Sequence, residues 1–123
     1  MMNQFNKIIA SFSFAFKGLA TLFKEERNAR IHLIATALVI IAGVYFNLSL
    51  IEWSLIVFAI GLVIIVETIN TVIENIMDYQ SLEKNPKIGK IKDLAAAAVL
   101  LSAIVAIIIA CFIFGPKIGE LFG

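Results

Sequence analysis

The chain has 123 residues, of which 61% are hydrophobic and only 15% are charged, and its net charge is +1. Soluble globular domains are about 45–50% apolar, so the composition argues against both a soluble enzyme and a disordered tail. The balanced charge argues against a nucleic-acid partner, which a basic stripe would accompany, and the single Cys111 can form no internal disulfide. The chain is therefore predicted to be an all-α integral membrane protein with a single domain over residues 1–123.

Residues 1–30 are predicted to form an amphipathic helix that lies in the membrane interface. Apolar residues recur there at spacings of three and four, which draws one apolar stripe along a helix. The stripe consists of Phe5, Ile8, Ile9, Phe12, Phe16, Leu19 and Phe23. Glu26 falls on the same stripe of this helix. A carboxylate in that position needs a partner such as a cation or a polar helix face, so Glu26 is a candidate functional residue.

Three transmembrane helices are predicted, over residues 31–51, 53–77 and 94–115. The first and the third contain uncharged stretches of 19 and 22 residues, each long enough to cross a hydrocarbon core of about 30 Å. The second has 14 uncharged residues before Glu67, and its apolar character then continues to its end. Residues 78–93 are predicted to form a cytoplasmic loop between the second and third spans.

Nine of the ten Lys and Arg residues lie either before the first span or between the second and the third. Positive residues are enriched on the cytoplasmic side of membrane proteins. The N-terminus is therefore predicted to be cytoplasmic and the C-terminus to lie outside.

A polar face on the second span is the most informative feature of the sequence. Glu67, Asn70, Thr71, Glu74 and Asp78 follow one another at helical spacing, so they share one side of the helix. Ionisable residues within a span are costly and by default indicate function, although a polar interface between helices is the structural alternative. Since Mg²⁺ commonly takes one or two carboxylates together with phosphate oxygens and water, Glu26 and Glu74 could share one divalent ion. The residues alone indicate a polar site at the inner leaflet and name no reaction.

Three segments together resemble the prokaryotic diacylglycerol kinase family, and the resemblance covers nearly the whole chain. They are residues 67–74 (ETINTVIE) followed by Asp78, residues 92–101 (KDLAAAAVLL), and residues 26–32 (ERNARIH) preceded by FKGL at 16–19. Members of that family are small homotrimeric membrane kinases that move the γ-phosphate of ATP to a lipid hydroxyl. The resemblance implies a lipid kinase of the bacterial inner membrane, with ATP as co-substrate and Mg²⁺ as cofactor.

The resemblance also implies roles for individual residues. Glu67 matches the catalytic base that acts on the lipid hydroxyl, and Glu26 and Glu74 match the carboxylates that bridge Mg²⁺. The implied nucleotide contacts are Lys7, Phe14, Glu26, Asn70, Glu74, Glu83, Lys84, Asn85, Lys92 and Asp93. The implied lipid contacts are Lys7, Glu67 and Ala96.

The chain is expected to assemble with copies of itself. A protomer with three spans has too few helices to shield Glu67, Asn70 and Glu74 from lipid, so a neighbouring subunit should cover them. The number of three subunits comes from the resemblance.

The choice of lipid substrate depends on one segment. Residues 26–32 look more like the branch described as undecaprenol kinases, because the diacylglycerol branch usually carries an acidic residue in the position of His32. Undecaprenol is therefore the expected acceptor, with undecaprenyl phosphate as product, and diacylglycerol, which would give phosphatidic acid, is the alternative.

A proton-coupled transporter subunit and a purely structural membrane oligomer are the non-enzyme alternatives. A transporter would place its key carboxylate near the midplane of the bilayer, whereas the polar face here opens at the inner interface. A structural oligomer would not need Glu26 on an apolar stripe. The phosphate-binding loops GxxxxGK[ST] and GxGxxG of soluble kinases are absent from the sequence.

Overall fold

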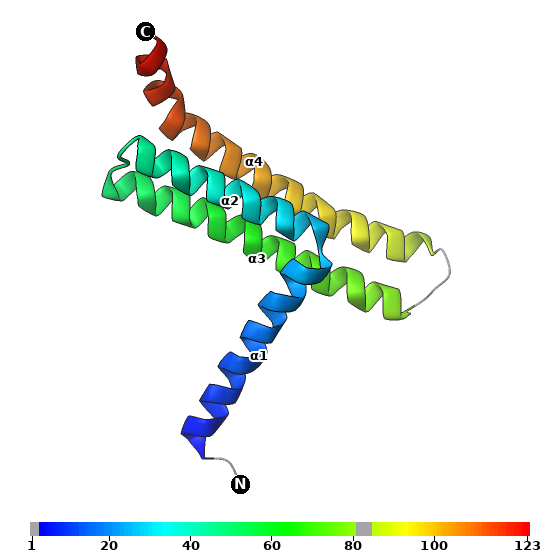
Figure 1. Cartoon of the computed structure of the whole chain (residues 1–123). Helices are drawn as coiled ribbons and strands as arrows, with labels where there is room; N and C mark the ends of the chain where they lie inside the picture. The colour runs from blue at the N-terminus through cyan, green and yellow to red at the C-terminus, as the bar shows by residue number, and fades with distance from the viewer. Residues whose placement is uncertain (1–2, 81–84) are drawn as a thin grey trace.

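Four α-helices make up the protein, whose computed structural model describes residues 3–80 and 85–123. They are α1 (Gln4–Glu25), α2 (Arg27–Tyr45), α3 (Leu50–Gln80) and α4 (Pro86–Phe122). The last three lie side by side in one bundle, while α1 projects from it (Figure 1). Each of these three is long and apolar enough to cross a membrane. The predicted all-α membrane fold is therefore confirmed.

The chain turns sharply between α1 and α2, so the predicted helix over residues 1–30 is shorter in the structure. Glu26 has extended backbone angles (φ −102°, ψ 114°) and joins the two helices. The guanidinium of Arg30 donates to the carbonyls of Phe23 and Lys24, at 3.3 and 2.8 Å. The last carbonyls of a helix have no partner within it, so Arg30 stabilises the end of α1. Glu26 consequently lies at a corner of the chain and not on the apolar stripe of a helix.

The opposite end of the bundle is a tight hairpin between α2 and α3. Asn47 has a positive φ of 52°, which Asn tolerates well. The backbone N–H of Ser49 donates to Glu52 Oε1, and that of Glu52 donates to Ser49 Oγ, which is the reciprocal cap that starts many helices. Next to this hairpin lies the buried apolar core, formed by Leu48, Ile56, Ile113 and Phe114.

Gly43 lets α2 pass close to α3, and its replacement by Ala should weaken the hairpin. A Cβ at this position would lie 2.5 Å from Cη2 of Trp53 and 3.0 Å from Leu48. Because overpacking a close contact costs about 1–3 kcal/mol, Gly43→Ala should lower the free energy of unfolding by that amount in detergent micelles. Gly61→Ala is the matched control, since nothing lies within 4 Å of a Cβ there. Equal stability of the two variants would contradict the close contact.

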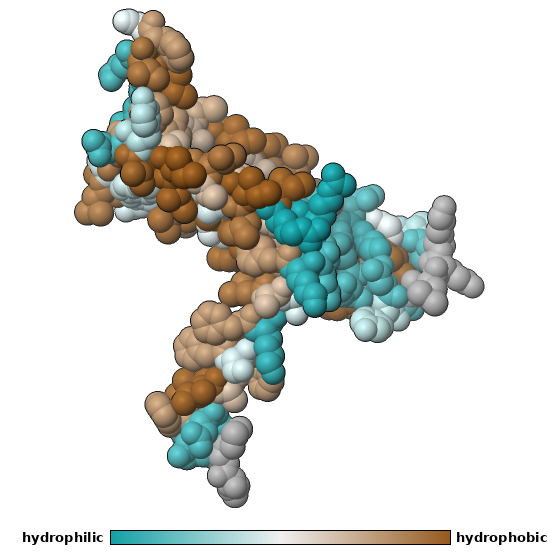
Figure 2. All heavy atoms as spheres, viewed as in Figure 1, coloured by the Kyte–Doolittle hydropathy of each residue, from teal (hydrophilic) through white to brown (hydrophobic). Residues whose placement is uncertain are grey.

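Within the segment 78–93, predicted as a loop, residues 78–80 and 86–93 are helical. With 31 and 37 residues, α3 and α4 are about 46 and 55 Å long, well beyond a hydrocarbon core of about 30 Å. Asn85 begins α4 by accepting from the backbone N–H of Lys87 at 2.9 Å, and Pro86 occupies the first turn. The two helices thus extend past the hydrophobic zone, and Figure 2 shows hydrophilic residues gathered where α1 meets the bundle and along the adjacent helix ends.

Candidate active site

Glu67 and Asn70 are buried within a single chain. Their exposed fractions are 2% and 6%, and Glu74, one turn further along α3, is half-buried. The expectation that a neighbouring subunit must cover all three is therefore wrong for the first two. The buried residues in the first half of α4 are Ala95 and Ser102, and such small side chains let two helices approach closely.

Two buried oxygen atoms in this region have no hydrogen-bond donor among the described residues. They are Oε2 of Glu67 and Oδ1 of Asn70. The imidazole of His32 on α2 lies close to Glu67, but its Nε2 is 3.8 Å from Oε2, too far for a direct hydrogen bond. Buried polar atoms nearly always have a partner. Glu67 and Asn70 thus each keep one buried acceptor atom that the described residues of a single chain do not fill.

Glu26 and Glu74 lie near enough to Glu67 for their carboxylates to interact with it electrostatically. Over residues 3–80 and 85–123, no Lys or Arg pairs with any of these three carboxylates. Within the same residues no group of three His, Cys, Asp or Glu side chains could hold a metal alone. Mg²⁺ needs only one or two carboxylates when phosphate oxygens and waters complete its shell, so the predicted ligands Glu26 and Glu74 would need a phosphate ligand to hold it.

Asn70 connects the buried and the half-buried parts of this face. Its Nδ2 donates to Glu74 Oε1 over 3.4 Å, a long hydrogen bond. Thr71, which shares the face, donates its hydroxyl to the carbonyl of Glu67 at 3.0 Å. The hydroxyl of Thr71 is therefore used within the helix, and the chemistry of the face depends on Glu67, Asn70 and Glu74.

Lys92 and Asp78 join the ends of α3 and α4. Nζ of Lys92 donates to Oδ1 of Asp78 over 2.6 Å, and this bond holds the pKa of the ammonium above its usual value. Asp93 is exposed beside it. Both members of the predicted nucleotide-binding pair thus lie beyond the predicted spans. Sequence reasoning placed Asp78 on the polar face without giving it this partner, because the contact links two helices that only the fold brings together.

The other predicted site residues are exposed on α1 and on α4 or its cap, as far as the structure describes them. Lys7 and Phe14 are exposed on α1, whose N-terminal end points away from the bundle (Figure 1). Ala96 is exposed on α4, and Asn85 caps that helix. Glu83 and Lys84 lie outside the described residues, so their predicted nucleotide contact is not described.

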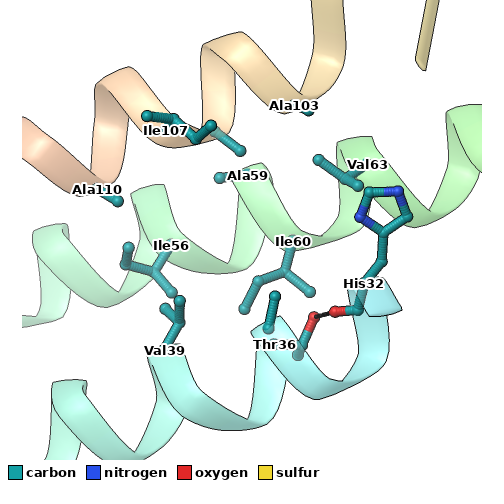
Figure 3. Close-up of a pocket in the computed structure, with 12 residues that line it drawn as sticks. His32, Thr36, Val39, Ile56, Ala59, Ile60, Val63, Ala103, Ile107 and Ala110 are labelled. Carbon is teal, nitrogen blue, oxygen red and sulfur yellow. Dashed lines mark hydrogen bonds between the residues drawn. The ribbon is translucent and has the colours of Figure 1, made fainter. Parts of the chain in front are cut away.

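A cavity of about 280 Å³ lies between α2, α3 and α4. Its lining is apolar apart from His32 and Thr36. Figure 3 shows the imidazole of His32 at one end of it, beside Val63 and with the alkyl side chains further along. Sequence reasoning left His32 out of the site, since its contact with Glu67 depends on how α2 packs against α3.

These features make up a candidate site in the membrane-spanning helices, in which the buried carboxylate of Glu67 lies close to His32 of an apolar cavity and about two turns from the half-buried Glu74. Residues 13–114 match the family model described as prokaryotic diacylglycerol kinase. The chain is 36% identical to the undecaprenol kinase of Bacillus subtilis, with 94% of each chain covered. It is 30% identical to the diacylglycerol kinase of Escherichia coli K12, also over 94% of each chain, and 35% identical to that of Synechocystis, over 89% of this chain and 63% of the relative.

The chain therefore belongs to the prokaryotic diacylglycerol kinase family and is a membrane lipid kinase. Family membership sets aside the transporter-subunit and structural-oligomer interpretations. ATP is the phosphoryl donor that this activity requires.

Proposed function

We propose that the protein transfers the γ-phosphoryl group of ATP to the hydroxyl of undecaprenol, with Mg²⁺ as cofactor. The observation that carries this proposal is the position of Glu67: a 2%-exposed carboxylate with an unpartnered oxygen, close to the polar end of an apolar cavity. A lipid alcohol has the matching shape, with one hydroxyl on a hydrocarbon body. The relative named undecaprenol kinase, at 36% identity, supports undecaprenol, and the two named diacylglycerol kinases keep diacylglycerol as the alternative.

Glu67 serves as general base in this proposal. Its Oε2 accepts the proton of the lipid hydroxyl while the hydroxyl oxygen bonds to the γ-phosphorus, and the bond from that phosphorus to the bridging oxygen of ADP breaks. Catalysis of this kind is mainly positioning and stabilisation of charge. Asn70 has a free amide oxygen and a long, replaceable bond to Glu74, so its amide can turn toward the phosphates.

The nucleotide is proposed to occupy the polar surface formed by the ends of α3 and α4. Lys92 neutralises phosphate charge and is held in place by Asp78, while Asp93 contacts the sugar or the base. Glu26 and Glu74 would hold Mg²⁺, which would neutralise the β- and γ-phosphates when bound. Lys7, Phe14 and Ala96 stay predicted contacts, which would require α1 or a neighbouring subunit to complete the site.

The protein is further proposed to be a homotrimer in the bacterial inner membrane, with its N-terminus in the cytoplasm and its C-terminus outside. The family supports the stoichiometry, and the position of nine of the ten Lys and Arg residues supports the orientation. With this orientation Lys92, Asp78 and Glu74 face the compartment that contains ATP. The mass of the protein in detergent measures the stoichiometry.

A kinase assay with purified protein tests the proposed acceptor. Labelled ATP is supplied with undecaprenol, with diacylglycerol or with no lipid, in mixed micelles that contain Mg²⁺. We expect kcat/KM to be higher for undecaprenol than for diacylglycerol. A preference for diacylglycerol would contradict the proposed substrate, and transfer to neither lipid would contradict the proposed reaction.

A further inference from the structure

The chain's single histidine lies where the apolar cavity meets the proposed base. His32 has a side chain that is 21% exposed, and its Nε2 is 3.8 Å from Oε2 of Glu67. Its ring also borders the cavity between α2, α3 and α4 (Figure 3). His32 therefore contacts both the space that can hold hydrocarbon and the atom that is to receive a proton.

The separation of 3.8 Å fits one shared oxygen atom. It is too long for a direct hydrogen bond between the imidazole and the carboxylate, but a hydroxyl oxygen between them could lie about 2.7–3.0 Å from each. Such a hydroxyl would donate its hydrogen to Glu67 Oε2, which lacks any described donor. It would accept a hydrogen bond from Nε2–H of a neutral imidazole. One lone pair of the oxygen would remain free to attack phosphorus.

The rest of the cavity lining limits what may carry that hydroxyl. Thr36 is the only other polar residue of the lining, and its hydroxyl already donates to the backbone carbonyl of His32 at 2.8 Å. No described donor of the lining is left for an ester carbonyl next to the hydroxyl. Burying such a carbonyl without a donor costs about 1–3 kcal/mol, whereas a plain hydrocarbon chain incurs no such penalty.

We propose that His32 is a further catalytic residue, which binds the acceptor hydroxyl together with Glu67 and selects alcohols whose neighbouring carbons carry no ester. The occupant of the cavity is the first part of a prenol chain. This inference rests on the proposed function and deepens it, because it explains how the same site distinguishes undecaprenol from diacylglycerol.

Enzyme kinetics of His32 variants give the first test. His32→Leu fills the space with an apolar side chain but removes the Nε2–H donor. The value of kcat/KM for undecaprenol should therefore fall about tenfold to a hundredfold, as expected for one hydrogen bond to a reacting group. The KM for ATP should change less than about threefold, because the proposed nucleotide site does not include His32. His32→Gln, which restores an N–H donor, should recover part of the loss. Ser54→Ala, which removes a hydroxyl of α3 outside the cavity lining, is the control and should keep the wild-type rate.

Direct spectroscopy gives a second test that needs no ATP and no variant. Because His32 is the only histidine, protein labelled with ¹⁵N-histidine gives imidazole signals that belong to one residue. Farnesol, a short prenol, should shift the Nε2 signal at lower concentration than dioctanoylglycerol does.

The two tests separate failure of this inference from failure of the proposed function. A wild-type enzyme that phosphorylates undecaprenol, with an imidazole signal that farnesol leaves unchanged, would overturn the role of His32 alone. The imidazole signal would also stay unchanged if a second copy of the chain, and not a prenol, covered the cavity, and that outcome too would overturn the role of His32. Equal responses to farnesol and dioctanoylglycerol would overturn the selectivity. Farnesol-dependent shifts without kinase activity on any lipid would uphold the binding role and overturn the proposed reaction.

Discussion

Replacing Glu67 by Gln should lower kcat at least about 10²-fold, the lower end of the range for general acid–base catalysis, while the affinity for ATP changes only a few-fold. Gln keeps the shape of the side chain and one oxygen acceptor but cannot take up the proton of the lipid hydroxyl. Glu67 is buried and lies seven residues from Glu74 along α3, about 10 Å, so its loss should leave the nucleotide side largely intact. Initial rates with undecaprenol and diacylglycerol, measured beside a nucleotide titration, check both parts.

Glu52→Gln is the matched control for this variant. Glu52 is a partly buried carboxylate of the same helix, at the opposite end, where it pairs with Lys117 at 3.2 Å. The same chemical change there should leave the rate near that of the wild type. If Glu67→Gln keeps near-normal rates on both lipids, Glu67 is not the base and its face serves helix packing.

Local sequence patterns were sufficient to predict the helices of the fold. Charge-free stretches of 19 and 22 residues indicated two spans, and the helical spacing from Glu67 to Asp78 indicated that the polar residues continue a third. The turn at Glu26 was not predicted because no Gly or Pro interrupts that segment. The hydrogen bonds from Arg30 to the carbonyls of Phe23 and Lys24 stabilise this turn. They form only in the turned chain, so the sequence does not reveal them.

The helical lengths of α3 and α4 were underestimated for a related reason. Hydropathy reports where a helix leaves the hydrocarbon, but a helix can continue into water, as α3 does to Gln80. The contact of Asp78 with Lys92 exists only because both helices continue in this way.

The candidate site could be predicted along one helix but not across helices. Spacing placed Glu67, Asn70 and Glu74 on a common face, because that relation is internal to α3. The burial of Glu67 and its proximity to His32 depend on the register of α2 against α3. The two helices also meet closely near their hairpin, where a Cβ on Gly43 would lie 2.5 Å from Trp53. A pattern in one segment contains no information about such a contact.

The charge balance of the site supports the proposal that Glu26 and Glu74 hold Mg²⁺. Glu26 and Glu74 come from different elements, the α1–α2 corner and α3, and both act on Glu67 without a described Lys or Arg partner. Three carboxylates near one another repel unless a cation lies among them. A bound divalent ion would relieve this repulsion, and it would attract the triphosphate to the side of Glu67 where the lipid hydroxyl must meet it.

Replacing Glu26 or Glu74 by Gln should therefore raise the Mg²⁺ concentration required for half-maximal rate by at least about tenfold, since even the loss of an outer-shell partner of a metal costs about 10–100-fold in affinity. Turnover at low Mg²⁺ should fall sharply in both variants and recover in part as Mg²⁺ is raised, because one carboxylate and the phosphate oxygens remain. Glu67→Gln should show no such recovery, because the base is absent at every metal concentration. Glu25→Gln is the matched control, as Glu25 is exposed at the end of α1 and directly precedes Glu26. Initial rates over a series of Mg²⁺ concentrations at fixed ATP separate these cases, and an unchanged Mg²⁺ dependence in both variants would remove Glu26 and Glu74 from the metal site.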